Sequence, residues 1–264
     1  MIAIALFSLI GVLIGITSSL FGFGGGFIVV PILYAFLPET IPADHVMHTA
    51  IGTSLAVMIV NSFNSTIHHA KNGNVRWDIF KFLFLFICIG SVFGGFLASF
   101  FTSEVLRFAF IAFLIYVIFS SIIKQTFVST IREDFQFPTY TNGLVTGVGI
   151  GTVSTLLGIG GSVVTIPYLR NRGLRMLHAV ALATPLGLPI AIVGTFMYLG
   201  LGIQVAEMPA STIGFIYLPA LFGFVFGGFI GVPIGRKIAQ KLPDALFSKV
   251  YLVLLIIVVI MMIE

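Results

Sequence analysis

The sequence predicts an all-α polytopic membrane protein made of two homologous four-element repeats. Of its 264 residues, 58% are hydrophobic and only 8% are charged, and the mean hydropathy is +1.16. A single soluble core cannot hide this much apolar surface, so most of it must face lipid. The second observation is a glycine-broken apolar pattern that occurs twice, as GVLIGITSSLFGFGGGFIVVPIL from Gly11 and as GVGIGTVSTLLGIGGSVVTIPYL from Gly147. About eleven of the aligned positions are identical, which indicates an internal duplication.

Hydropathy divides the chain into eight apolar segments, because a membrane span needs about 20 apolar residues. Segments one and five carry the glycine breaks. The other segments also pair, since IGTSLAVMIV from Ile51 resembles LATPLGLPIAIV from Leu182, and GSVFGGFLASF from Gly90 resembles GFVFGGFIGVPIG from Gly223. The predicted segments cover residues 2–37, 48–67, 79–101, 105–124, 143–169, 176–200, 211–235 and 245–263.

A polar stretch separates the two repeats. It contains Arg132, Glu133, Asp134 and Pro138. We therefore expect an N-terminal transmembrane repeat at residues 1–124, a polar connector at 125–142 and a C-terminal transmembrane repeat at 143–264.

Charge placement favours an inverted arrangement of the two repeats. The acidic loops contain Glu39, Asp44 and Glu207, whereas basic residues follow segments two, five and seven. If the basic connectors face the cytoplasm, the first repeat begins inside and the second begins outside. Inversion requires one further crossing or re-entrant element, and the uncharged segment 2–37 is long enough to turn back at its glycines. Parallel repeats with a weak charge bias are the alternative. The basic residues are Lys71, Arg76, Lys81, Arg170, Arg172, Arg175, Arg236, Lys237 and Lys241.

The glycine breaks are the candidate binding site. Consecutive glycines free backbone N–H groups, which survive at membrane depth only when buried in protein or lining a wet cavity. The residues after each break can restart as half-helices with positive N-terminal ends, and two facing ends would hold an anion without lysine or arginine. Matching glycine interruptions in two halves also point to a transporter site. The candidate substrate-binding residues are Ser18, Ser19, Gly22, Gly24, Gly25, Gly26, Asn61, Ser154, Thr155, Gly158, Gly160, Gly161 and Ser162.

Several of these features have a second, purely structural interpretation. The hydroxyls near the breaks, which include Thr17 and Thr152, can bond back to carbonyls one turn earlier. Asn61 is as well suited to joining helices as to contacting a ligand. The glycines at every fourth position of segment seven allow two helices to approach closely, within one subunit or at a homodimer interface. Further polar groups in segments two and six are Thr53, Ser54, Asn64, Ser65 and Thr184.

Other chemistries are disfavoured by what the spans contain. No carboxylate lies in the middle of a predicted span, which argues against a carboxylate proton relay and against cation transport. Cys88 is the single cysteine, so we expect no intrachain disulfide and no cysteine-based metal cluster. His45 and His48 superficially resemble a metal site, but interfacial hydrogen bonding explains them better. We expect no catalytic residue, metal, cofactor or nucleic-acid partner, since membrane orientation accounts for the +4 formal charge.

The stretch GFGGGFIVVPIL from Gly22 and its partner GIGGSVVTIPYL from Gly158, followed by GTSL and ATPL, resemble the TauE/SafE sulfite exporter family. This family is also called the 4-toluene sulfonate uptake permease family, and the resemblance covers both halves. It implies a membrane permease for small sulfur-containing anions such as sulfite or organosulfonates. We accordingly expect a secondary transporter that works by alternating access in a bacterial or archaeal cell membrane, with the lipid bilayer and a small anion as its partners.

The second repeat departs from the first at two positions. Ser162 stands opposite Gly26, and Pro185 stands opposite Ser54, so equivalent roles for the two halves are doubtful. Two alternatives to a permease remain open at this stage. One is a polytopic membrane enzyme, and the other is a non-transporting assembly subunit that docks through its glycine stripes.

Overall fold

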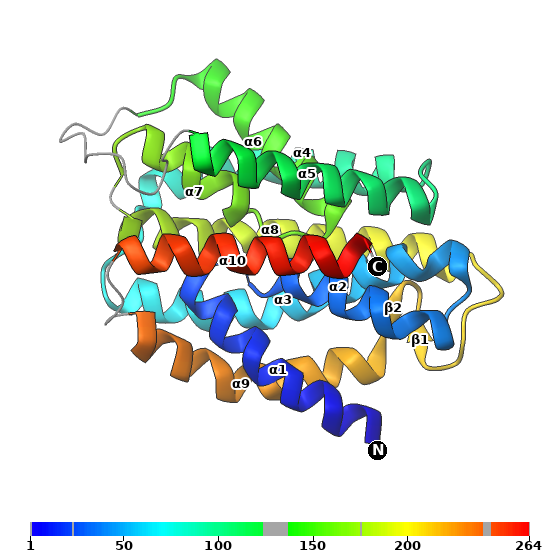
Figure 1. The fold of residues 1–264 in the computed structure, drawn as a ribbon. Coiled ribbons are helices and arrows are strands. Elements are labelled where there is room, and N and C mark those ends of the chain that lie inside the picture. Colours follow the sequence, from blue (N-terminus) through cyan, green and yellow to red (C-terminus); the bar gives the residue numbers. More distant parts are fainter. Residues whose placement is uncertain (1, 23, 124–136, 175, 240–243, 264) are drawn as a thin grey trace.

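The computed structural model describes residues 2–22, 24–123, 137–174, 176–239 and 244–263. The described residues form ten α-helices, two short 3-10 helices and one small hairpin (Figure 1). The α-helices are α1 (Ile2–Phe21), α2 (Gly26–Phe36), α3 (Val46–Lys71), α4 (Trp77–Ala98), α5 (Ser103–Ile123), α6 (Tyr140–Leu157), α7 (Ser162–Asn171), α8 (Met176–Ile203), α9 (Leu218–Ala239) and α10 (Asp244–Ile263). The 3-10 helices are η1 (Leu37–Glu39) and η2 (Ala43–His45), and strands β1 (Thr212–Ile213) and β2 (Ile216–Tyr217) pair antiparallel.

The eight predicted segments are helical, the predicted glycine breaks divide two of them, and the start of segment seven differs from the expected boundary. Segments one and five are each divided into two helices at their glycines. Segment seven was expected from residue 211, but its helix begins at Leu218 because the preceding residues form the β1–β2 hairpin. Gly214 makes the hairpin turn with a φ of 56°, a left-handed conformation that favours glycine. Most of the expected connector, residues 125–136 with Arg132, Glu133 and Asp134, lies outside the described residues, as do Arg175 and Lys241.

The surface of the molecule is apolar and its interior is partly polar. Among the described residues, six helices are long and apolar enough to cross a membrane, with spans at Ile4–Phe21, Ala43–Lys71, Trp77–Ala98, Ser103–Ser120, His178–Ile203 and Leu218–Ile238. Large side chains such as Leu9, Phe108, Phe196 and Phe226 are exposed, whereas many serines and threonines are buried. This pattern is that of an integral membrane protein whose outer face contacts lipid.

Glycine stripes bring four helices together in two pairs. A Cβ on Gly11 of α1 would lie 2.9 Å from the Cα of Phe224 in α9, and Gly231 of α9 packs on the Val12 carbonyl. In the other pair, Gly90 of α4 packs on α6, where the hydroxyl of Thr152 donates a hydrogen bond of 3.1 Å to the Gly90 carbonyl. The stripe in α9 therefore serves close packing within the chain, one of the two interpretations that the sequence allowed.

Helix α3 is the central element. The span that contains it is 83% buried, compared with 44% or less for the other five spans. It packs against α2, α5, α8 and α9. Polar side chains on α3, among them Ser54 and Asn61, are thereby held inside the protein.

The chain reverses direction at the first glycine cluster. The ring of Phe7 near the start of α1 lies 6.1 Å from that of Phe36 at the end of α2, and Gly25 before α2 lies against Ile14 and Ser18 of α1. The two helices are thus antiparallel, with α2 running back toward the end of the molecule where α1 begins (Figure 1). Segment 2–37 turns back at its glycines, as its length predicted.

Candidate functional site

The two glycine breaks lie against each other at the centre of the molecule. A Cβ on Gly26 would lie 2.7 Å from the carbonyl oxygen of Gly158 and 3.3 Å from the backbone nitrogen of Gly160. Only a residue without a side chain fits this contact, because real Cβ atoms essentially never approach another atom closer than 3.0 Å. Two segments that are far apart in the sequence therefore meet through their backbones.

Left-handed glycines produce the breaks. Gly22, Gly24 and Gly25 have φ values of 69°, 65° and 91°, and Gly158 has a φ of 66°. Residues with a side chain rarely adopt this conformation, so these positions end one helix and redirect the chain. In the second break Gly161 has a φ of −52°, so the two breaks differ in local geometry although their sequences match.

Two short helices start at the breaks. Helix α2 begins at Gly26 and α7 begins at Ser162. Because Gly26 touches Gly160, two residues before Ser162, the N-terminal ends of both helices lie beside one another. A helix start carries about half a positive charge, and its first amides have no partner further back in the helix. Here Ile28 and Val163 donate to the carbonyls of Gly25 and Gly160, at 3.2 and 3.3 Å. The arrangement is suited to an anion that accepts hydrogen bonds.

Helix α3 supplies the side chains that hold the breaks. The hydroxyl of Ser54 lies 2.9 Å from the carbonyl oxygen of Gly26 and 2.9 Å from that of Gly158. The Asn61 amide donates a hydrogen bond of 3.3 Å to the Gly24 carbonyl. Asn61 thus bonds the first break and contacts α9 at Gly228, which is the helix-joining role. Contact between Asn61 and a ligand stays a prediction.

Several buried hydroxyls near the breaks have no hydrogen-bond partner among the described residues. They belong to Ser19, Thr155, Ser162 and Thr165, all of which are at most 4% exposed. Most buried polar groups in proteins are paired, so these unpaired hydroxyls call for an explanation such as a bound ligand.

The remaining predicted residues also lie at the breaks. A Cβ built on Gly25 would lie 3.6 Å from the Cβ of Ser18, and a Cβ built on Gly161 would lie 3.6 Å from the hydroxyl oxygen of Ser154. Both serines are at most 2% exposed. The structure thus gathers both copies of the predicted serine and glycine set in one buried region.

Two hydroxyls near the breaks in sequence point elsewhere. Thr17 donates to the carbonyls of Leu13 and Ile14 one turn back, at 2.9 and 3.0 Å. Thr152 is engaged with α4, as described above. These two threonines therefore take the structural interpretation, in which a hydroxyl satisfies a nearby helix carbonyl.

Comparison with known proteins identifies the family. Residues 7–262 match the family described as sulfite exporter TauE/SafE. The chain belongs to the TauE/SafE family. It is 30% identical to a probable membrane transporter protein of Haemophilus influenzae, over 96% of each chain. It is 31% identical to a probable membrane transporter protein of Methanocaldococcus jannaschii, over 91% of this chain and 90% of the relative. No solved structure matches the chain. The family and these relatives indicate a membrane transporter.

Two polar residues of this TauE/SafE protein escaped the sequence analysis. One is Ser62, whose hydroxyl oxygen would lie 2.5 Å from a Cβ built on Gly24. The other is Thr165 of α7, which is fully buried and whose hydroxyl has no hydrogen-bond partner among the described residues. The available signal for Thr165 was its place one turn after Ser162 in α7. Ser62 carries no local signal, because only the fold of α3 against the first break brings it to the site.

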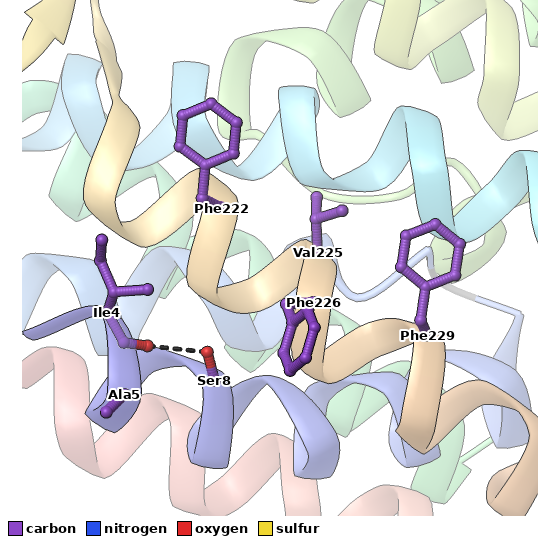
Figure 2. A pocket seen from close by; sticks show the side chains of 7 residues that line it. All are labelled: Ile4, Ala5, Ser8, Phe222, Val225, Phe226 and Phe229. Atoms are coloured by element: carbon purple, nitrogen blue, oxygen red, sulfur yellow. Dashed lines mark hydrogen bonds between the residues drawn. The ribbon is translucent and has the colours of Figure 1, made fainter. Parts of the chain in front are cut away.

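Two pockets among the described residues lie away from the breaks. One, of about 570 Å³, lies between α1 and α9 and is walled by apolar side chains (Figure 2). Its one hydroxyl, on Ser8, already donates to the Ile4 carbonyl at 2.8 Å, so this pocket offers nothing to an anion. Its lining residues are Ile4, Ala5, Ser8, Phe222, Val225, Phe226 and Phe229.

A second pocket, of about 330 Å³, contains the histidines that superficially resembled a metal site. His48 hydrogen-bonds the Ala98 carbonyl at 3.2 Å, and the rings of His45 and His48 lie 5.4 and 5.2 Å from that of Phe215. In the part of the chain that the structure describes, no three histidine, cysteine or acidic residues are grouped to hold a metal ion.

Proposed function

We propose that this TauE/SafE protein is a secondary transporter that binds a small sulfur-containing anion, such as sulfite or an organosulfonate, between its two glycine breaks. The observation that carries the proposal is the meeting of the α2 and α7 N-terminal ends at Gly26 and Gly160. Oxyanions accept several hydrogen bonds at once, and backbone amides at helix starts donate them in the required direction. The family name supports a sulfur oxyanion as the substrate class.

The electrostatics of the interior support an anion without a fixed counter-charge. The buried polar side chains of the described residues are serines, threonines, one asparagine and one histidine, with no aspartate, glutamate, lysine or arginine. A carboxylate at the breaks would repel an anionic substrate. Neutral donors and helix ends bind an anion while allowing it to leave. The same composition gives no acid or base for catalysis at the breaks, and we propose a transporter rather than an enzyme.

We further propose that the halves on either side of residues 125–142, residues 1–124 and 143–264, are inverted repeats. In sequence, α1 corresponds to α6 and α9 corresponds to α4. The contact between α1 and α9 therefore has a counterpart in the contact between α6 and α4, and each contact joins helices of different halves. Gly25 has Ile14 and Ser18 as neighbours, and Gly161 has their counterparts Ile150 and Ser154.

Helix directions support the inversion. The corresponding helices α3 and α8 are antiparallel, because Gly52 lies beside Tyr198 while Ser62 lies beside Gly187. In the same way Arg107 near the start of α5 bonds the carbonyl of Met262 near the end of α10. Alternating access follows if the two halves rock about the central pair α3 and α8.

The distribution of charge supports an orientation in the membrane. Lys71 and Arg236 lie at the ends of α3 and α9, which meet at one end of the molecule, whereas Asp44 lies at the opposite end beside the hairpin (Figure 1). By the positive-inside rule the basic end faces the cytoplasm. Because α1 begins at the opposite end, and α6 runs parallel to α4 from the basic end, the first repeat would begin outside and the second inside. This order is the reverse of the one expected from the sequence, because α2 returns to the end where α1 begins. We propose a bacterial or archaeal cell membrane as the location, with lipid and the small anion as partners.

Flux measurements in liposomes test the proposal. Purified protein is reconstituted, and uptake of labelled sulfite and short organosulfonates is followed with and without a pH gradient. Saturable uptake that is absent from protein-free vesicles supports an anion transporter, and its response to the gradient reports proton coupling. Absence of uptake for every anion tested, in vesicles that hold folded protein, would remove the proposed substrate class.

A further inference from the structure

Ser54 is the side chain that touches both breaks. It lies on α3 and is completely buried, with its hydroxyl 2.9 Å from the Gly26 carbonyl of the first break and 2.9 Å from the Gly158 carbonyl of the second. We infer that Ser54 is a positioning residue that clamps the two breaks together, so that backbone donors from both address the same anion. The clamp itself rests only on the two Ser54 contacts. Its effect on transport rests on the proposed function as well.

The clamp explains how two irregular segments stay in contact inside the membrane. A hydroxyl has one hydrogen, so Ser54 shares its donor between two carbonyl oxygens. Asn61 bonds the first break only, at Gly24. Among the described residues, Ser54 is thus the side chain whose hydrogen bonds span the contact between Gly26 and Gly158. Without it, both buried carbonyls would lose a donor, which is costly where no water replaces it.

The clamp also affects the charge that an anion meets. Carbonyl oxygens carry partial negative charge, and two of them from different segments converge beside the helix N-terminal ends. A hydroxyl hydrogen directed at these oxygens reduces their repulsion of a nearby anion. Ser54 thereby favours anion binding without touching the anion.

The second repeat has no equivalent hydroxyl. Pro185 of α8 occupies the place of Ser54 when GTSL is matched with ATPL, and proline has neither a hydroxyl nor a backbone N–H. One clamp is sufficient, because a single donor placed between the breaks serves both of them. This difference accounts for one of the two departures of the second repeat from the first.

A matched pair of variants tests the clamp. Ser54→Ala removes the bridging hydroxyl, and Thr53→Ala removes the neighbouring, equally buried hydroxyl, which accepts a hydrogen bond of 2.8 Å from the Tyr217 N–H. Hydrogen–deuterium exchange is measured on the purified full-length protein without substrate. We expect faster exchange in peptides covering residues 22–30 and 157–165 for Ser54→Ala, and faster exchange confined to the hairpin for Thr53→Ala.

Transport kinetics give the second readout. We expect Ser54→Ala to raise the KM for labelled sulfite by about tenfold, the effect of losing one to two hydrogen bonds. Ser54→Thr, which keeps the hydroxyl, restores the KM, and Thr53→Ala leaves it unchanged. Wild-type exchange at both breaks together with a wild-type KM in Ser54→Ala would overturn the clamp, as would exchange that rises equally throughout the protein.

Two further outcomes are separated by the design. If the wild-type protein transports no anion, the proposed function fails, and the exchange measurement still decides whether the clamp exists. If Ser54→Ala does not fold, Ser54→Cys replaces it, because a thiol has a similar shape and is a weaker donor. Wild-type exchange and KM in Ser54→Cys would then count against the clamp, and intermediate values would support it.

Discussion

Replacing Gly26 with alanine tests whether contact between the two breaks matters for function. Gly26 is not among the glycines with positive φ, so alanine meets no backbone strain there. Its Cβ would instead lie 2.7 Å from the Gly158 carbonyl oxygen and 3.0 Å from the Ser54 hydroxyl. An ordinary contact begins at 3.4 Å, so the breaks must separate by roughly 0.7 Å. Inserting one carbon into a packed interior costs about 1–3 kcal/mol.

This cost is expected to appear as weaker binding of the anion. If the strain is borne by the arrangement that binds substrate, affinity falls tenfold for each 1.4 kcal/mol or so. The expected loss is therefore about fivefold to somewhat more than a hundredfold. Equilibrium binding of labelled sulfite to the purified protein and the KM of uptake into liposomes both measure it, and thermal unfolding in detergent reports any general loss of stability.

A matched control separates this effect from that of any glycine-to-alanine change. Gly149 lies on α6, is exposed, and has no atom within 4 Å of the position that a Cβ would take. Gly149→Ala is expected to leave binding unchanged and to stabilise the helix by up to about 1 kcal/mol. If Gly26→Ala bound and transported sulfite as the wild type does, with the same melting temperature, the anion site would not depend on contact between the breaks.

Three further substitutions probe other parts of the structure. Thr155→Val removes an unpaired buried hydroxyl, so thermal stability should be unchanged or higher while sulfite affinity falls about tenfold; lower stability with unchanged affinity would contradict this. Arg107→Gln removes two hydrogen bonds, of 2.7 and 2.9 Å, to carbonyls at the end of α10. Calorimetry should record a fall of about 1–3 kcal/mol in the free energy of unfolding. An unchanged melting curve would show that these hydrogen bonds do not stabilise the protein. Gly231→Ala should lower the yield of folded protein because α1 packs directly on that position, whereas Gly200→Ala, with open space around it, should not; equal yields would show that the contact is dispensable.

The elements of the fold could be predicted because their signals are local. Long apolar runs indicate spans, and consecutive glycines indicate where a helix ends, so the division of segments one and five follows from the sequence. The start of segment seven was wrong because hydropathy windows do not recognise turn chemistry. The residues before Leu218 are apolar enough to extend the helix, but Gly214 and the pairing of Thr212 with Tyr217 form a hairpin.

The candidate site was only partly accessible to sequence reasoning. Symmetry between the repeats predicted that both breaks contribute, but nothing local indicates that Gly26 touches Gly158 and Gly160. The significance of Ser54 depends on that contact, since its two hydrogen bonds reach segments on both sides of the connector. Similarly, the sequence does not show which hydroxyls near a break bond a carbonyl of their own helix, as Thr17 does, and which have no partner, as in Ser19. The difference depends on how each helix is rotated against its neighbours.

The asymmetry between the breaks follows from the contact that joins them. Gly26 must lack a side chain because the second break presses on it, whereas its counterpart Ser162 is under no such constraint at the start of α7. The freed position carries a buried hydroxyl without a partner. The first break therefore contributes a backbone surface that lets the two breaks approach, and the second adds a side-chain donor at the matching place. The contact requires glycine at position 26 but not at position 162, which is a physical reason for the difference between the two matched sequences.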